Sequence, residues 1–469
     1  MKEIRFGTDG WRGIIADDFT FDNVEIVSRA IGKFILKRHE PSLPILIGHD
    51  PRFLADKFAL ACANKLANLR LNIQITSSVT PTPVLAYNAS ANKTNGAIQF
   101  TASHNPPKYL GIKYITNYGG PAPEEVTDEI TKYISSQQSA LSNQQSAVSS
   151  QIQTFDPKSK YFSHLKKLID FNLIRNAGLK IVYDPLYGAG NNYLDCILKE
   201  AGCEVITIHN KKDPLFGGLL PEPKEESLDD LKKAIHLNKA DLGIATDGDA
   251  DRISAIDQDG TFFSPNEIAS MLLRHLYKNK KLKGKVVRTI STTHMLDHLA
   301  KKYNLELVET KVGFKWIAQE MINSTVLLGA EESGGFSILN HIPDKDAILT
   351  GLLLCEMIAY EKKPLKEIYK ETINETGWYC VNDRLDLHMN EAQKNDLISK
   401  LQSETLKEIN GLKVKSINKI EGAKYIFEDG SWFLARASGT EPMARVYFEA
   451  TSDKVLGEIK KTIQELITI

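Results

Sequence analysis

Hydrophobic and polar positions along this chain alternate between short apolar runs, rich in β-branched residues, and longer helix-length segments. Such runs predict strands, and the segments between them predict helices. Examples of the expected strands are Pro44 to Gly48, Ala97 to Thr101, Leu179 to Tyr183, Glu204 to Ile208, Leu242 to Thr246 and Val326 to Leu328. Examples of the expected helices are Asp22 to Arg38, Lys57 to Leu69, Asn191 to Ala201, Leu228 to Leu237, Asn266 to Tyr277 and Asp346 to Glu361. This alternation predicts α/β layering.

From about Gly377 the pattern changes, because the expected strands lie in pairs that flank helices. These strands are Arg384 to Leu387, Lys413 to Ile420, Trp432 to Ala437 and Arg445 to Glu449, and the helices are Asn390 to Ile409 and Asp453 to Leu466. This arrangement is typical of an α+β module.

The length of 469 residues exceeds what one hydrophobic core organises, so we expect about three or four domains. Residues 135 to 153 are low in complexity and rich in Ser and Gln, which is typical of a solvated connection. With that connection as the first limit, we expect domains at residues 1–153, 154–256, 257–374 and 375–469.

Charge and cysteine content exclude several classes of protein. Lys and Arg number 58 against 59 for Asp and Glu, so no global field attracts nucleic acid or an anionic membrane. The five cysteines form no CxxC pair, which argues against a disulfide framework or a thiol-rich metal cluster. The most apolar stretch, Ile348 to Tyr360, is too short to span a bilayer, and MKEIRFGTDG has no apolar signal segment. We expect a cytoplasmic enzyme that acts on small molecules.

Three aspartates at alternate positions carry the strongest chemical signal. Asp247, Asp249 and Asp251 stand in ATDGDADR, directly after an expected buried strand. Two carboxylates about 4 Å apart repel by about 4 kcal/mol at an effective dielectric constant of about 20, so three together call for a cation. Oxygen ligands without His or Cys favour magnesium, manganese or calcium. Arg252 and Gln258 occupy the EF-hand's Gly and Glu places, which excludes that motif; a solvated acidic turn is the alternative.

Ser103 follows another expected strand, in TASHNPP, where the prolines prevent an early helix. Thr101 and Asn105 stand where the G-x-S-x-G elbow of acyl-transfer hydrolases has glycines, so a serine triad is not supported. A turn capped by Ser or Asn is the alternative to a functional loop. Lys113 is a candidate base if the chain returns beside Ser103, although an isolated lysine usually faces solvent.

Arg436 opens the loop RASGTEP, which combines a guanidinium, two hydroxyls and a glycine after a strand. Arg binds phosphate oxygens in a bidentate way, and Gly lets backbone N–H groups approach an anion, so we interpret this loop as holding phosphate; a plain turn is the alternative. Nucleotide binding has no support, because neither G-x-x-x-x-G-K-[ST] nor G-x-G-x-x-G occurs. AEESGG, from Ala330, offers carboxylates to sugar hydroxyls. FGTDGWRG, from Phe6, offers an exposed arginine between glycines, and a purely structural loop is the alternative there.

Taken together, FGTDGWRG, TASHNPP, DGDADR, AEESGG and RASGTEP resemble the motifs of the α-D-phosphohexomutase superfamily, in the family's order and over nearly the whole chain. The resemblance implies four domains around a central cleft: three similar α/β mixed-sheet domains and a C-terminal α+β domain of the TATA-binding-protein-like type. In chain order they carry the phosphoserine loop, the metal-binding loop, the sugar-specificity loop and the phosphate-binding loop.

The resemblance also implies a role for each motif residue. Ser103 carries the transferable phosphate, Lys113 is the candidate general acid/base, and Arg12 and His104 support the phosphoserine. The implied Mg²⁺ ligands are an oxygen of that phosphoserine and the side chains of Asp247, Asp249 and Asp251. The implied substrate-binding residues are Arg252 at the reacting end, Gly313, Lys315, Glu331 and Ser333 at the sugar, and Arg436, Ser438, Gly439 and Thr440 at the phosphate that does not react.

The implied reaction interconverts a hexose 1-phosphate and a hexose 6-phosphate, with one Mg²⁺ per chain and hexose 1,6-bisphosphate as intermediate and activator. Sugar phosphates are the expected partners, and the chain is expected to be a monomer or a homodimer. Gly335 and VGFK resemble glucose-type enzymes, so glucose comes first and mannose second. Glucosamine comes third, because its enzymes usually carry EQSGH. Ala330 departs from the family's first glycine without changing a contact residue.

Two other hypotheses come from different classes. A magnesium phosphatase of the aspartyl-phosphate type shares the Asp247-Gly248-Asp249 start, but Asp251 stands where that motif has Thr or Val. A non-catalytic sugar-phosphate sensor on the same fold is disfavoured by the presence of Ser103, Lys113 and all three aspartates.

Overall fold

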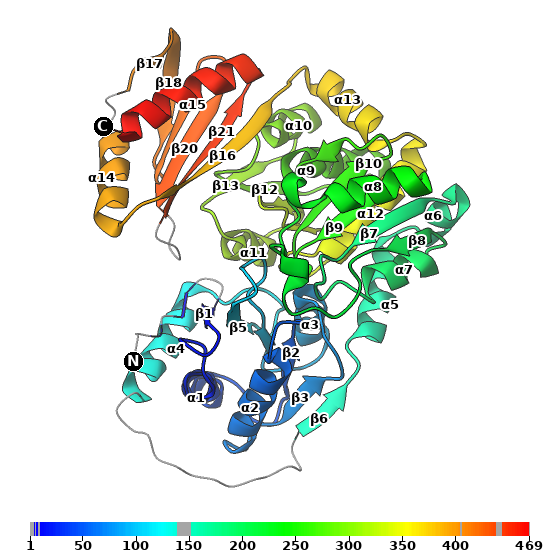
Figure 1. Ribbon diagram of the computed structural model, residues 1–469, viewed down its shortest axis with the longest axis vertical. Helices are drawn as coiled ribbons and strands as arrows, with labels where there is room; N and C mark the ends of the chain where they lie inside the picture. Colours follow the sequence, from blue (N-terminus) through cyan, green and yellow to red (C-terminus); the bar gives the residue numbers. More distant parts are fainter. Residues whose placement is uncertain are drawn as a thin grey trace.

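The computed structural model describes residues 4, 6–7, 10–137, 152–403, 406–437 and 443–468. This part of the chain forms four sheets of six, five, four and six strands, in sequence order. In Figure 1 the first sheet (blue) lies at the bottom, the second and third (green) lie to the right and above it, and the fourth (orange to red) lies at the upper left. None of the described helices is long and apolar enough to cross a membrane.

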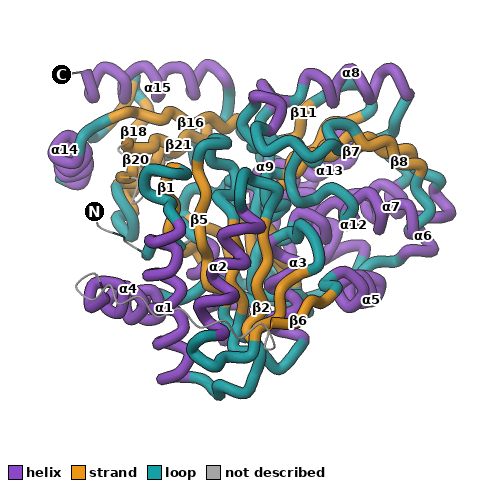
Figure 2. The backbone as a smooth tube through the Cα atoms, turned by 60° about the horizontal axis from the view of Figure 1, so that its bottom comes forward, coloured by secondary structure: helices purple, strands orange, loops and turns teal. Residues whose placement is uncertain are grey.

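Helices cover both faces of the first sheet, whose order is β1-β5-β4-β2-β3-β6. Its strands are β1 (Trp11–Ile14), β2 (Ile45–His49), β3 (Ile73–Thr76), β4 (Ala97–Phe100), β5 (Tyr109–Ile115) and β6 (Ile152–Phe155), and its helices are α1 (Phe21–Arg38), α2 (Ala55–Ala67), α3 (Thr82–Ala91) and α4 (Glu124–Gln137). Alternate residues of a strand face opposite sides, so Ile45 and Ile47 pack with α1 and α2 whereas Leu46 packs with α3. Figure 2 shows α1 and α2 in front of this sheet.

The domain limit expected after residue 153 falls inside β6. This strand pairs in parallel with β3, through Ile73 and Ile152, and so completes the first sheet. Residues 138–151 of the expected connection lie outside the described residues, and α4 extends through residues 135–137. The other domain limits stay a prediction.

The second sheet places the three aspartates at a strand end. Its order is β11-β10-β9-β7-β8, and β9 runs parallel to β7 but antiparallel to β10, so the aspartate loop joins a hairpin. Its elements are β7 (Lys180–Asp184), β8 (Glu204–Thr207), β9 (Leu242–Thr246), β10 (Ile253–Asp257) and β11 (Phe262–Phe263), with α5 (Lys158–Leu168), α6 (Phe171–Ala177), α7 (Leu194–Glu200), α8 (Asp229–Asn238) and the 3-10 turns η2 (Phe216–Gly218) and η3 (Glu225–Ser227).

The third sheet shares one hydrophobic core with the second. Its strands are β12 (Lys285–Thr289), β13 (Leu307–Thr310), β14 (Val326–Ala330) and β15 (Phe336–Ile338), and its helices are α9 (Pro265–Arg274), the π-helical turn η4 (His275–Asn279), α10 (Met295–Tyr303), α11 (Phe314–Asn323), α12 (Ala347–Glu361) and α13 (Leu365–Thr376). Gly351 of α12 allows the close approach of α7, since a Cβ there would lie 2.9 Å from Leu194 Cδ2. The two domains are therefore packed as one unit around their common core.

The fourth sheet is antiparallel and docks on the third domain. Its strands are β16 (Val381–His388), β17 (Glu408–Ile409), β18 (Leu412–Asn418), β19 (Ala423–Phe427), β20 (Trp432–Ala437) and β21 (Met443–Ala450), and its helices are α14 (Glu391–Gln402) and α15 (Asp453–Thr468). One face packs against these helices, and the other packs Trp432, Leu434 and Tyr447 against Ile290 and Val312. The third domain thereby supports the strand that carries Arg436.

The helix expected over Asn390 to Ile409 is too long, because α14 ends at Gln402. Glu408–Ile409 instead forms β17, paired with the start of β18. Asn410 and Gly411 connect these strands with φ values of 47° and 83°. Positive φ at both central residues is the geometry of the two-residue hairpin turn that Asn-Gly favours. Because of this turn, residues 408–409 form a strand and do not extend the helix.

Candidate active site

Ser103 lies just beyond β4 in a left-handed backbone conformation, with φ of 50°. Its N–H donates to Thr101 Oγ1 at 2.9 Å, and its Oγ donates to Asp247 Oδ2 at 2.8 Å. Only 1% of Ser103 is exposed. The loop after β4 and the hairpin loop after β9 therefore meet at one buried hydroxyl.

Arg52 holds the shape of the Ser103 loop. The guanidinium is buried and its Nε donates to Asp50 Oδ2 at 3.1 Å. Its two terminal nitrogens donate to four backbone carbonyls, those of Ser103, Asn105, Pro106 and Tyr109. Because a left-handed Ser is disfavoured on its own, this set of bonds stabilises the strained turn.

The three predicted aspartates converge as expected from their spacing. All are buried, and each offers an oxygen within 4.8 Å of the others. Asp247 Oδ1 accepts the N–H groups of Asp251 and Arg252, which folds the loop back on itself. Burial, with the carboxylates of Asp251 and Asp249 added to it, raises the pKa of Asp247 well above its usual range.

The aspartate cluster fits a hard divalent cation. Asp249 Oδ1 and Asp251 Oδ1 are buried and have no hydrogen-bond partner. Buried polar atoms are rarely left without a partner, and the ligands here are oxygens alone, the donor set that Mg²⁺ prefers. These two atoms, with Asp247, are the ones that would hold the ion.

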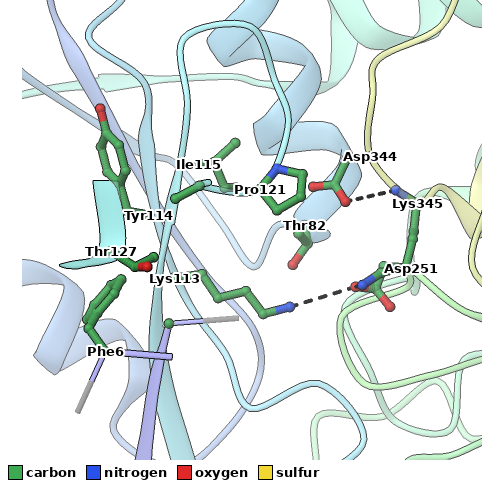
Figure 3. Close-up of a pocket in the computed structure, with 12 residues that line it drawn as sticks. Phe6, Thr82, Lys113, Tyr114, Ile115, Pro121, Thr127, Asp251, Asp344 and Lys345 are labelled. Carbon is green, nitrogen blue, oxygen red and sulfur yellow. Dashed lines mark hydrogen bonds and ion pairs between the residues drawn. The ribbon is translucent and has the colours of Figure 1, made fainter. Parts of the chain in front are cut away.

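Lysines from two other domains lie beside the carboxylates, and Figure 3 shows Lys113 and Lys345 with Asp251. Lys113 Nζ of β5 lies 3.0 Å from Asp249 Oδ2 and 3.7 Å from Asp251 Oδ2, and Lys345 Nζ lies 3.2 Å from Asp251 Oδ2. Thr82 Oγ1, at the start of α3, donates to Asp249 Oδ2 at 2.6 Å. Burial raises the pKa of Asp249, but Lys113 and the Thr82 hydroxyl outweigh it and lower that pKa below its usual value. Asp249 is therefore held as a carboxylate.

Cations also gather around His104, next to Ser103. His104 Nδ1 lies 3.4 Å from Ser103 Oγ. Burial and the positive charges of Arg252 and Arg12 lower the pKa of His104 well below its usual value, so His104 is neutral. Arg12 donates to Asn105 Oδ1, and Arg252 Nε is buried without a hydrogen-bond partner. This concentration of positive charge suits a phosphoryl group on Ser103.

The expected sugar-contact residues lie together in the third domain. Gly313 N, ahead of α11, donates to Glu331 Oε1 at 3.1 Å, and Ser333 follows in the same turn after β14. Lys315 Nζ reaches into the first domain, where it lies 2.6 Å from Glu124 Oε1 of α4. The contact between Lys315 and Glu124 joins the first and third domains.

Arg436 is the next-to-last residue of β20 in the fourth domain, and its Nε donates to Glu421 Oε1 at 2.7 Å. Arg445 of β21 lies directly opposite it in the sheet register, so the two guanidiniums belong to one face. Ser438, Gly439 and Thr440 lie outside the described residues.

Three residues of the site, Arg52, Thr82 and Lys345, were not predicted from the sequence. Arg52 carried a local signal, since Asp50-Pro51-Arg52 follows a strand as other polar loops of the chain do. Thr82 and Lys345 carried none, because each reaches the carboxylates only through the packing of one domain on another.

Four family models match the chain in order. They are described as phosphoglucomutase/phosphomannomutase alpha/beta/alpha domain I (residues 3–141), domain II (159–260), domain III (264–376) and the C-terminal domain (391–466). Together they run over most of the sequence, and each of the four sheets lies largely within one of them.

Curated relatives match over almost their full lengths. A phosphoglucosamine/phosphogalactosamine mutase of Sulfurisphaera tokodaii is 29% identical, with 98% of each chain covered. A phosphoglucomutase/phosphomannomutase of Thermococcus kodakarensis is 29% identical over 96% of this chain and 95% of its own. A phosphoglucosamine mutase of Alkaliphilus oremlandii is 31% identical, with 98% of each covered.

A solved structure shows the same arrangement. The crystal structure of a putative phosphomannomutase from Thermus thermophilus is 32% identical and superposes with a TM-score of 0.87, covering 100% of this chain and 99% of that one. A family protein from Burkholderia thailandensis, 21% identical with a TM-score of 0.84 over 100% of this chain and 98% of its own, shares the fold.

Proposed function

We propose that this chain, which belongs to the phosphoglucomutase/phosphomannomutase family of the α-D-phosphohexomutase superfamily, interconverts the 1- and 6-phosphates of a hexose. Members of the superfamily are isomerases. Glucose is the first candidate for the sugar. The observation that carries the proposal is the hydrogen bond from Ser103 to Asp247, with Lys113 beside the same carboxylate cluster. It unites a candidate phosphate carrier, a candidate cation site and a candidate base in one buried place.

In the proposed reaction, a phosphoryl group moves between Ser103 Oγ and a sugar hydroxyl. The Ser103 O–P bond breaks as the hydroxyl oxygen bonds to phosphorus, while neutral Lys113 takes the hydroxyl proton and the Ser103 oxygen leaves as an alkoxide. The bisphosphate then turns end for end, and its other phosphate returns to Ser103. In this second transfer the Ser103 oxygen attacks the other phosphate, and Lys113 returns the proton to the sugar oxygen that leaves. The fold supports this, because Lys113 lies 3.0 Å from Asp249 in a buried position, close to the cluster that Ser103 touches.

A cation held by Asp247, Asp249 and Asp251 would neutralise charge on the transferring phosphoryl oxygens. Arg12 and Arg252 add positive charge beside Ser103 and His104. Arg436 is proposed to bind the phosphate that is not reacting, while Glu331, Ser333 and the Gly313–Lys315 segment bind the sugar. Burial of Ser103 keeps water from a phosphoserine, which it would otherwise hydrolyse.

Glucose is supported by Gly335. A Cβ at this position would lie 2.2 Å from Lys345 Cδ, so the lysine occupies the space that a side chain such as histidine would need. The enzymes of the superfamily that act on both mannose and glucose usually have histidine there. Glucosamine is the second candidate, because relatives at 29% and 31% identity bear the name phosphoglucosamine mutase.

The test offers glucose, mannose and glucosamine 1-phosphates side by side to the purified protein with Mg²⁺ and a trace of hexose 1,6-bisphosphate. We expect glucose 1-phosphate to give the highest kcat/KM, and a preference for glucosamine 1-phosphate would replace it as the substrate. Intact mass and ³¹P NMR should show one phosphate on Ser103. Label on Asp247 instead would support a phosphatase, and neither label nor turnover would support a sensor.

A further inference from the structure

Glu421 links the candidate phosphate-binding arginine to a different domain. It lies in the turn between β18 and β19, where its Oε1 accepts from Arg436 Nε at 2.7 Å. Its Oε2 accepts from the backbone N–H of Val312, in the third domain, at 2.6 Å. One carboxylate thus satisfies a donor on each side of the interface, and its side chain is only 22% exposed.

The backbone is shaped to bring Glu421 to this place. Gly422 follows with φ of 68°, and a Cβ there would lie 2.1 Å from Ala435 O and 3.0 Å from Arg436 Cα. Only glycine permits both this conformation and this approach to a neighbouring backbone. The turn therefore packs directly against Ala435 and Arg436 of β20.

The link continues into the sugar loop. Val312 N donates to Glu421, and the next N–H along the chain, that of Gly313, donates to Glu331 Oε1 at 3.1 Å. Two successive peptide groups are thereby held, Lys311–Val312 by Glu421 of the fourth domain and Val312–Gly313 by Glu331 of the sugar loop. These hydrogen bonds, joined through Val312, link Arg436 to Glu331.

We propose that Glu421 is a positioning residue that orients Arg436 for a phosphate and sets the distance between Arg436 and the sugar loop. This inference rests on the proposed function, because it requires that Arg436 bind the phosphate that does not react. A carboxylate on Nε fixes the plane of the guanidinium, and the two terminal nitrogens are then the pair that takes a phosphate in a bidentate way. Glu421 acts through Arg436 and the backbone N–H of Val312, without touching the substrate.

The test is a double-mutant cycle on Glu421→Gln and Arg436→Ala, with steady-state kinetics on glucose 1-phosphate and Mg²⁺. Glutamine keeps the size but replaces one accepting oxygen by a donor, so one of the two contacts is lost. Because the phosphate held by Arg436 does not react, we expect KM to rise about tenfold with kcat within about twofold. In the Arg436→Ala background, Glu421→Gln should change KM by less than about twofold, because its target is gone.

Asn418→Ala is the matched control. Asn418 Nδ2 donates across the same interface, to Glu309 Oε1, three positions before Glu421. If Glu421 only stabilised the contact between the domains, Glu421→Gln and Asn418→Ala would lower Tm and raise KM to a similar extent. We expect Asn418→Ala to leave KM within about twofold of the wild type, and Glu421→Asp, which keeps the charge, to recover part of the lost affinity.

Three results would overturn the inference: an unchanged KM in Glu421→Gln, independent effects that multiply in the double variant, or failure of every Glu421 variant to fold, which would make the residue structural. Failure of the proposed function looks different. In that case the wild type turns over none of the hexose phosphates, or Arg436→Ala keeps the wild-type KM, and both proposals fall together.

Discussion

The Ser103 hydroxyl donates its hydrogen bond to an oxygen of Asp247, a residue 144 positions further along the chain. The contact crosses from the first domain to the second and is fully buried. The hydroxyl faces carboxylates whose mutual repulsion is only partly relieved by Lys113 and Lys345. A metal ion bound to the carboxylates and a phosphoryl group on Ser103 would therefore change the charge of the site together.

Replacing Ser103 with Ala should abolish the interconversion of hexose 1- and 6-phosphates, by at least about 10⁴-fold in kcat, because the phosphate carrier is lost. The circular dichroism spectrum should match that of the wild type, and the intact mass should show no phosphate. Ser42→Ala, at an exposed serine of the same domain, serves as the control and should keep full activity. Turnover by Ser103→Ala at the wild-type rate would remove Ser103 from the reaction.

A chelator should lower activity by at least about 100-fold, and Mg²⁺ should restore it. The ion should also raise Tm, since ligand at 100 times its Kd stabilises the folded state by about 2.7 kcal/mol. Asp249→Asn should lose both responses, because the unpartnered Oδ1 of Asp249 is one of the atoms placed to bind it. Asp229→Asn, on an exposed helix start, should respond like the wild type. A Mg²⁺-dependent Tm rise in Asp249→Asn would place the ion elsewhere.

Arg52→Lys should loosen the Ser103 loop. A lysine ammonium has three donors in place of the guanidinium's five and cannot reach four carbonyls and Asp50 together. We expect the free energy of unfolding to fall by about 2–4 kcal/mol and kcat to fall about tenfold or more. Chemical denaturation and steady-state kinetics measure the two effects, with exposed Arg70→Lys as the control. Unchanged kcat would show that the loop keeps its shape without Arg52.

Stability should fall in acid partly through His164. Burial, followed by the charge of His341, lowers the pKa of His164 from 6.5 to about 4. His164 Nε2 lies 3.0 Å from His341 Nδ1, and the His164 ring stacks on Tyr87. Between these pH values the unfolded chain binds a proton at His164 more readily than the folded chain does. The contribution of His164 to the free energy of unfolding is therefore fully present above about pH 6.5 and is lost as the pH falls towards 4.

Thermal melts between pH 7 and pH 4 check this expectation. The Tm of His164→Gln should fall less than that of the wild type over this pH range, because glutamine does not titrate. His236→Gln, at an exposed histidine, should follow the wild-type curve. Identical slopes for all three proteins would contradict the assignment.

The elements named from local patterns occur near their expected places, and one of them is too long. The strands expected at Leu242 to Thr246 and Trp432 to Ala437 occur with those bounds, because each is an apolar run bounded by turn residues. The helix expected to reach Ile409 stops at Gln402, because Asn410 and Gly411 build a hairpin that competes with it. Turn chemistry of two residues outweighed the helical preference of the residues before them.

By itself, the sequence determined the α/β layering, the α+β character of the last domain and the spacing that brings Asp247, Asp249 and Asp251 into one loop, since each depends on neighbours within a few positions. Only the tertiary structure decided that Arg52 organises the Ser103 loop, that Thr82 and Lys345 reach the aspartates, and that Glu421 joins Arg436 to Val312. The Arg52 contacts join loops of one domain that lie far apart in the sequence, and the other contacts arise when separate domains pack together. Neither periodicity nor spacing along the chain encodes which surfaces meet.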